Sequence, residues 1–183
     1  MKEKEVILLA ATQLGIADKI QAYYNGSSTE GEKDAELLLT CFNLVESELA
    51  LDYFPLYAEE ELNTFSGRIN YSLLAHAVVR IIRVADTEGN TVDYTLFPDC
   101  LKGPVGTLKI YYTYTPKKKT VDKESDFETR VTDRLLSYGI AAEYATAKGL
   151  YEEAAIWDKK YKDAIEVAYR TMPGVRMKAR RWV

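Results

Sequence analysis

Residues 125–170 read SDFETRVTDRLLSYGIAAEYATAKGLYEEAAIWDKKYKDAIEVAYR, and this stretch decides the architecture of the chain. Its second half repeats apolar side chains at alternating steps of four and three, the spacing of one buried stripe on an α-helix. These residues are Leu150, Ala154, Trp157, Tyr161, Ala164 and Ala168. The first half carries the same spacing at Val131, Leu135, Tyr138, Ala142 and Ala145. The two stripes predict a pair of helices.

Local signals indicate where these two helices begin and end. Ser125 precedes Glu128 by three residues, the pattern of a capping box, so we expect the first helix to begin near Asp126. Gly149 can adopt the left-handed conformation that ends a helix at little steric cost. Glu152 and its neighbouring glutamate then fall in the first turn of the second helix, near the positive end of its dipole. The sequence therefore predicts an antiparallel helical hairpin.

Small side chains are concentrated between the two stripes. They are the alanines at 141, 142, 145, 154, 155 and 164. Small residues let two helix backbones approach closely, and aromatic side chains then fill the remaining space. We therefore expect Leu135, Tyr138, Trp157 and Tyr161 to form the core of the hairpin.

The first 54 residues predict further helices. Residues 4–24 carry an approximate apolar face with a possible break at Gly15, and the sequence NGSS that follows is typical of a turn. Thr29 and Glu32 form a second capping-box pattern. The helix that we expect after it has its apolar residues at Ala35, Leu38, Phe42, Val45 and Leu49. Pro55 ends this helix, because the residue before a proline disfavours the α region.

Between residues 56 and 116 the apolar period changes towards two, which indicates β-strands. AVVRIIRV at 77–84, the turn DTEGN and TVDYTLF at 91–97 together predict a β-hairpin. TLKIYYTY at 107–114 alternates polar and apolar side chains and predicts a third strand. Shorter polar pieces at 58–64 and 68–73 predict edge strands, whose charges would discourage stray pairing. These charges are Glu59, Glu60, Glu61 and Arg68.

The expected fold class is α+β, with a helical bundle made from both ends of the chain and a small antiparallel β module inserted between them. We assign residues 1–54 and 117–171 to the bundle, 55–116 to the β module and 172–183 to an extended basic C-terminal tail. That tail contains Arg176, Lys178, Arg180, Arg181 and Trp182. A basic terminus is often disordered, yet an aromatic residue among arginines is typical of interfaces, and the sequence leaves both interpretations open.

Composition limits the classes of protein to consider. The chain has 183 residues, of which 47% are hydrophobic and 28% charged, as in an ordinary soluble domain. Its longest apolar run, residues 6–11, is far shorter than the ~20 residues that span a bilayer, and its first residues do not resemble a signal peptide. We expect a cytoplasmic protein with Cys41 and Cys100 as free thiols. The formal net charge of −4 does not favour general adhesion to nucleic acid.

Motifs for catalysis or cofactor binding are missing from the sequence. His76 is the single histidine, and no recognisable arrangement of Ser, Cys or acidic partners surrounds it. Paired cysteines, HExxH, GxGxxG and the Walker loop are all absent. Glu143, Glu152 and Glu153 are most simply solvated charges on a polar helix face. We expect no catalytic residue, no cofactor and no metal ion.

Five stretches together carry a family resemblance. They are GRINYSLL at 67–74, VVRIIRVADTEGNTVDY at 78–94, GTLKIYYTYTP at 106–116, RLLSYGIAAEYATAKGLYEEAAIWDKKYKDAI at 134–165 and MKARRWV at 177–183. With them, nearly the whole chain resembles the head-to-tail connector (adaptor) proteins of tailed bacteriophages, which are often found in prophages. The characteristic part is YGIAAEYA followed by a glycine turn and a helix of the form EEAxxWxxxY.

The resemblance implies a structural protein of the virion rather than an enzyme. It implies a homo-oligomeric ring, usually a dodecamer, that lies under the portal protein, binds tail or neck proteins and connects the capsid to the tail. DNA would pass through the ring as non-specific cargo, and no membrane would be involved. The ring would be assembled in the host cytoplasm and would lie at the head-tail junction. The resemblance further implies that the C-terminal tail docks on the portal through Arg176, Lys178, Arg180, Arg181 and Trp182.

Two other classes of function stay open. A nucleic-acid-associated regulatory protein would use the lysines at 117–119 and the basic tail, and its DNA affinity would fall with salt. A small-molecule enzyme would need polar groups that converge in a pocket, which only a tertiary structure can reveal.

Overall fold

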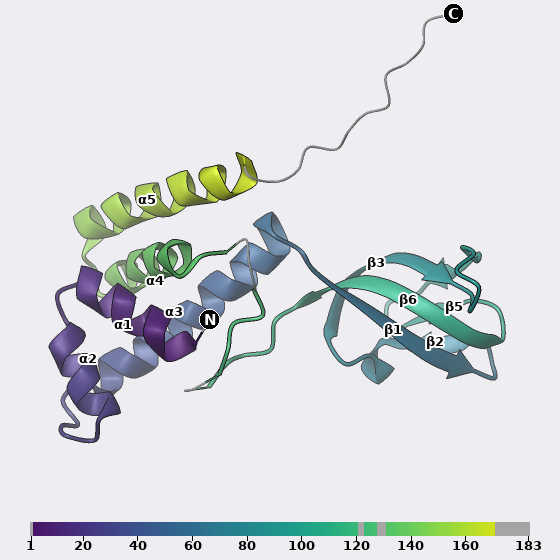
Figure 1. Ribbon diagram of the computed structural model, residues 1–183, viewed down its shortest axis with the longest axis horizontal. Helices are drawn as coiled ribbons and strands as arrows, with labels where there is room; N and C mark the ends of the chain where they lie inside the picture. The colour runs from purple at the N-terminus through teal and green to yellow at the C-terminus, as the bar shows by residue number, and fades with distance from the viewer. Residues whose placement is uncertain (1, 121–122, 128–130, 171–183) are drawn as a thin grey trace, which may run out of the picture.

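A computed structural model describes residues 2–120, 123–127 and 131–170 (Figure 1). The fold is α+β, as the sequence predicted: helices gather at one end, and two small antiparallel sheets project from them at the other. We refer to helices α1 to α5 as the helical bundle and to residues 56–115 as the β module. None of the helices within the described residues is both long and apolar enough to cross a membrane.

The N-terminal part forms three helices, α1 (Glu3–Gln13), α2 (Ala17–Tyr24) and α3 (Glu32–Glu48). The break expected at Gly15 is confirmed, since this glycine has φ +72° between α1 and α2. The capping box expected before α3 is wrong, because no side chain caps that helix. The backbone N–H of Glu32 instead donates to the backbone oxygen of Thr29, at 3.1 Å.

Helix α3 passes directly into η1 (Leu49–Tyr53), a π-helical turn that leads to the β module. The backbone N–H of Phe54 donates to the carbonyl of Leu49, at 2.6 Å, and closes this turn. Helical structure thus ends before Pro55, as the sequence predicted.

The helical hairpin consists of α4 (Asp133–Ala147) and α5 (Tyr151–Arg170), joined at Gly149 with φ +76°. Its first helix begins later than the expected Asp126. Thr132 is the N-cap of α4, because its hydroxyl accepts from the backbone N–H of Leu135, at 3.2 Å. The hydroxyl of Ser125 donates elsewhere, so the sequence pattern alone did not start a helix there.

The two hairpin helices pack closely because small residues line their contact. Gly139 is buried, and a Cβ atom at this position would lie 2.7 Å from Cγ1 of Val45 and 2.9 Å from Cε2 of Tyr161. Leu135 and Tyr161 are buried. Tyr138 and Trp157 are only half-buried, with their ring centroids 5.8 Å apart. Two of the four residues in the predicted core of the hairpin are therefore buried, and the other two stay partly exposed to solvent.

The first sheet has the strand order β1–β6–β3, with all pairs antiparallel. Its strands are β1 (Leu56–Thr64), β6 (Gly106–Thr115) and β3 (Ala77–Ala85). The predicted strand at 107–114 is confirmed and is central, with Leu108 and Ile110 buried on one face. The polar strand expected at 58–64 is also confirmed at an edge.

The hairpin expected between residues 77–84 and 91–97 is wrong as a pairing of two strands. β3 pairs along its length with β6, and beside it the chain keeps a single bridge between Ala85 and Thr91. β4 (Thr95–Leu96) instead joins β5 (Cys100–Lys102) and β2 (Arg68–Asn70) in a second sheet of order β2–β5–β4. β6 occupies one edge of β3, and residues 95–96 pair with β5, so beyond the bridge, residues 91–97 do not extend along the other edge of β3.

The described residues form two separate hydrophobic cores. The larger core lies in the helical bundle and includes the large, fully buried side chains of Ile7, Ile20, Leu38, Phe42, Leu49 and Leu136. The smaller core lies between the two sheets and a short 3-10 turn, η2 (Tyr71–Leu73). It includes Ile69, Leu101, Leu108, Ile110 and Tyr112. The β module is thus built around side chains of its own.

Candidate functional site

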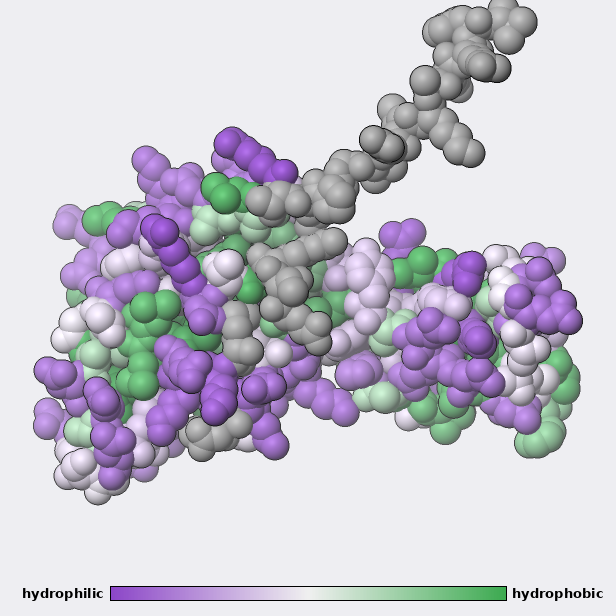
Figure 2. Space-filling view, in the orientation of Figure 1, coloured by the Kyte–Doolittle hydropathy of each residue, from purple (hydrophilic) through white to green (hydrophobic). Residues whose placement is uncertain are grey.

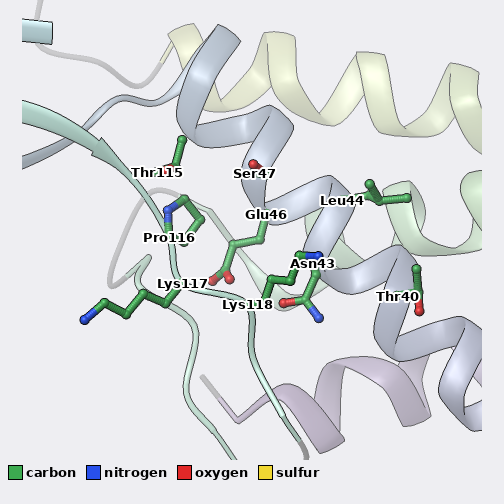
Figure 3. Close-up of a pocket in the computed structure, with 9 residues that line it drawn as sticks. All are labelled: Thr40, Asn43, Leu44, Glu46, Ser47, Thr115, Pro116, Lys117 and Lys118. Carbon is green, nitrogen blue, oxygen red and sulfur yellow. The ribbon is translucent and has the colours of Figure 1, made fainter. Parts of the chain in front are cut away.

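The junction between the helical bundle and the β module contains an open cavity of about 390 Å³. One wall is α3, and the other is the start of the chain that returns from β6. We call residues 116–120 and 123–127 of this chain the returning segment. Figure 3 shows the carboxylate of Glu46 directed from α3 towards this segment. The cavity is lined by Thr40, Asn43, Leu44, Glu46, Ser47, Thr115, Pro116, Lys117 and Lys118.

Polar side chains of α3 hold the returning segment in place. One carboxylate oxygen of Glu46 accepts from the Ser125 hydroxyl at 2.6 Å and from the backbone N–H of Asp126 at 3.0 Å. The Asn43 side chain accepts from the backbone N–H of Lys119 at 2.6 Å and donates to its carbonyl at 3.2 Å. The Lys119 ammonium pairs with Asp126 at 2.7 Å. We call these five residues the junction cluster.

Glu46 is the most unusual ionisable group of the cluster, because its side chain is only 1% exposed. Burial raises its pKa, and the hydrogen bonds from Ser125 and Asp126 counteract this only in part. A carboxyl group with a raised pKa can serve as a general acid or base. However, no histidine or cysteine lines the described cavity, and both hydrogen bonds of this oxygen go to the returning segment. The arrangement suits an anchor better than a catalytic centre.

A second buried carboxylate connects the helices at the far end of the bundle. Asp34 on α3 pairs with Lys19 of α2 and with Lys148 at the end of α4, both at 2.7 Å. It also accepts from the Tyr144 hydroxyl, at 2.9 Å. The hydrogen bonds from Lys148 and Lys19 hold the pKa of Asp34 well below its usual range. This group therefore stays charged and fastens the hairpin to the N-terminal helices.

The remaining candidates for chemistry are dispersed. His76 stacks on Tyr114 with ring centroids 4.1 Å apart, and its buried Nδ1 atom has no hydrogen-bond partner among the described residues. Cys41 on α3 and Cys100 on β5 are both buried and free, as expected. Burial raises the pKa of Cys41 to about 12, the opposite of an activated thiol. Within the described ranges, no group of three or more His, Cys, Asp or Glu residues could hold a metal ion.

The predicted docking tail, with Arg176, Lys178, Arg180, Arg181 and Trp182, lies outside the described residues. The end of α5 that precedes it is fixed next to the junction. The ring of Tyr169 stacks on Phe54 with centroids 5.1 Å apart, and its hydroxyl donates to the carbonyl of Tyr53, at 2.7 Å. The chain therefore leaves α5 beside η1, where the bundle meets the β module.

Exposed apolar side chains on the β module are a feature that the sequence analysis missed. Phe65 in the turn after β1 is 89% exposed, and Val105 in the turn before β6 is 66% exposed. Figure 2 shows hydrophobic surface at the end of the β module farthest from the helices. A phenylalanine between Thr64 and Ser66 in a turn was the sequence signal for this surface, since turns are normally polar.

The sequence matches no family model, and no curated protein matches it.

Proposed function

We propose that this chain is a structural head-to-tail adaptor of a tailed bacteriophage or prophage, which forms a ring under the portal, connects the capsid to the tail and lets DNA pass. The observation that carries the proposal is the apolar surface that the projecting β module exposes. Phe65 follows Thr64 and Val105 precedes its paired residue Gly106, so the two side chains belong to neighbouring turns, and they are 89% and 66% exposed. Apolar side chains gathered on an exposed surface are typical of sites that bind other proteins.

The polar contacts of the bundle support a structural role. The junction cluster and the ion pairs of Asp34 with Lys19 and Lys148 fasten one part of the chain to another. A ring closes only when each subunit keeps a fixed angle to the next. The β module is held to the bundle by both η1 and the returning segment, so it meets that requirement. Two flexible connections between the β module and the bundle would not fix this angle.

In this proposal the basic tail binds the portal. Its arginines would pair with carboxylates on the portal, and Trp182 would bury its ring among them, because arginine and tryptophan are common anchors of interfaces. The tail or neck proteins of the phage would bind the ring on its other side, and DNA would pass through the lumen without being read. This assignment needs no cofactor and no catalytic residue.

The experiment is to mix the purified full chain with its cognate portal ring and to record electron micrographs and sedimentation profiles. A chain truncated after Val175 should keep its thermal stability, because both hairpin stripes stay intact, but should lose portal binding. Trp182→Ala alone should weaken binding by roughly 2 kcal/mol or more if this residue is a hot spot. Lys118→Ala, which removes an exposed lysine outside the tail, serves as the control and should bind normally.

Two results would contradict the proposal. A full chain that fails to bind the portal at high concentration is not its adaptor. A truncated chain that binds the portal normally shows that the tail is not the docking segment. The nucleic-acid alternative predicts a different pattern, in which truncation abolishes salt-sensitive binding to any duplex and leaves portal binding unchanged.

A further inference from the structure

The two edges of the β1–β6–β3 sheet carry opposite charges. On β1, Tyr57, Glu59 and Glu61 are exposed. We call these three residues the acidic edge. On β3, Val79, Arg80 and Ile82 are among the exposed residues, and we call these three the basic edge. Strand β6 lies between the two, so the edges are on opposite sides of one sheet.

The strand register places the charged side chains of both edges on the same face of the sheet. Tyr57 of β1 and Arg80 of β3 both lie opposite Thr113 of β6, and directly opposed residues share a face. Arg80 forms no ion pair with any described residue. Glu59 accepts a hydrogen bond from the neutral Tyr111 hydroxyl, at 3.1 Å, and Glu61 has only a distant cationic partner, the Lys109 ammonium at 4.0 Å. Charge is therefore available at both edges for a contact outside the subunit.

The basic edge is also irregular. The register between β3 and β6 shifts between Val78 and Arg80 and again between Ile81 and Arg83, so Val79 and Ile82 are extra, bulged residues. Both are apolar, and they are 47% and 46% exposed. Bulges interrupt the row of backbone groups that another strand would need for pairing. A partner would consequently meet side chains here rather than extend the sheet.

The apolar residues of the basic edge are not isolated. Val79 and Ile82 line a groove of about 460 Å³ that runs across the outer face of the sheet to Tyr57 and reaches Leu51 of η1. Leu51 is 47% exposed and Tyr57 is 67% exposed. Each edge therefore combines apolar and charged side chains, and the charges of the two edges differ in sign.

We infer that the basic edge of one subunit docks on the acidic edge of a second copy of this chain. Arg80 would lie between Glu59 and Glu61 of the second copy, with Val79 and Ile82 against its Tyr57. Pairing two acidic edges or two basic edges would bring like charges together, so the complementary arrangement is head-to-tail. This inference rests on the proposed ring, and it identifies the surface through which successive subunits would bind.

Charge reversal tests the contact on the full chain. Sedimentation velocity at low ionic strength should show the wild-type protein associating beyond a dimer as its concentration rises, and added salt should reverse this. Arg80→Glu alone, or Glu59→Arg combined with Glu61→Arg, should weaken association about tenfold or more, because like charges would face each other. An equimolar mixture of the two variants should associate again, since each then supplies the edge that the other needs.

Several controls separate loss of contact from loss of fold. Circular dichroism should show both variants folded, and Lys33→Glu, which reverses an exposed charge in the first turn of α3, should associate like the wild type. A wild-type chain that stays monomeric at about 1 mM, where a contact of only about −4 kcal/mol would be half-formed, overturns the inference. Association that stops at a dimer overturns the head-to-tail arrangement, as does a mixture of folded variants that fails to associate.

The portal assay distinguishes this inference from the proposed function. If Arg80→Glu still forms a complete ring on the portal, the edge contact is wrong and the adaptor function stands. If the wild type associates through its edges but never binds the portal, the edge contact stands and the adaptor function fails.

Discussion

Two buried carboxylates on α3 have pKa values shifted in opposite directions. Asp34 lies between the ammonium groups of Lys19 and Lys148, which stabilise its charged form. Glu46 receives hydrogen bonds from the neutral groups of Ser125 and Asp126, and burial is the stronger influence on its pKa. On the same helix, Asp34 therefore stays charged, whereas the charge of Glu46 depends on pH.

The raised pKa of Glu46 predicts a pH-dependent stability. In an unfolded chain a glutamate has a pKa of about 4.3, so between that value and the folded pKa the native state binds more protons. The contribution of Glu46 to stability is therefore present at low pH and is lost as pH rises through its folded pKa. Glu46→Gln keeps the acceptor oxygen but cannot ionise, so it should be about as stable as the wild type near pH 4 and relatively more stable at pH 8.

Urea unfolding of both proteins across this range measures the difference. The control is Glu36→Gln, an exposed glutamate on the same helix, which should leave the pH profile unchanged. If Glu46→Gln loses stability relative to the wild type as pH rises, the carboxylate is charged and favourable in the native state, and the prediction is wrong.

At the scale of elements, Gly139 sets the distance between the hairpin and α3. Gly139→Ala would add about 1 kcal/mol of helix propensity, but its Cβ atom would overlap Val45 and Tyr161. Overpacking typically costs about 1 to 3 kcal/mol, so we expect a net loss of stability.

A double-mutant cycle isolates this contact. Val45→Ala removes the nearer of the two clashing side chains, so Gly139→Ala should cost less in that background than in the wild type. Denaturant unfolding of the four proteins measures the free energies of unfolding that the cycle compares. Equal costs in both backgrounds would mean that Val45 does not limit the approach of the helices.

Tyr161 and Trp157, the two α5 residues of the predicted hairpin core, should differ in their contributions to stability. Tyr161 is 5% exposed, so Tyr161→Ala should cost about 3 to 5 kcal/mol, the usual penalty for deleting a core aromatic residue. Trp157 is half-buried against Tyr138, so Trp157→Ala should cost about half as much or less, because less apolar area leaves water on folding. Chemical denaturation compares the two, and an equal loss would show that Trp157 is as well covered as Tyr161.

At the scale of the whole molecule, the two cores predict two regions of distinct stability. Ile110→Ala should cost the β module about 2 to 5 kcal/mol, while Leu38→Ala should cost the bundle a similar amount. Hydrogen exchange measured by mass spectrometry reports each region separately. Faster exchange confined to the mutated region is the expected result. Faster exchange in both regions after either change would show that the chain unfolds as one cooperative unit.

What the sequence determined by itself is the set of features that depend on neighbouring residues. The break at Gly15, the turn at Gly149 and the alternating face of β6 each follow from local conformational preference or from the spacing of apolar side chains. The α+β class followed from the change in that spacing along the chain. The role of the basic tail stays a prediction, carried by the family resemblance.

Only the tertiary structure decided which surfaces meet. The spacing of apolar residues shows that a face is to be buried, but it does not show which partner covers it. β3 therefore pairs with β6 rather than with residues 91–97, and Trp157 is left half-exposed. For the same reason, α4 begins later than the sequence predicted. The Ser125 hydroxyl donates to Glu46, which is 79 residues away in the sequence. Contacts between residues so far apart in the sequence depend on how whole helices and strands pack together. The local spacing of residue types does not specify that packing.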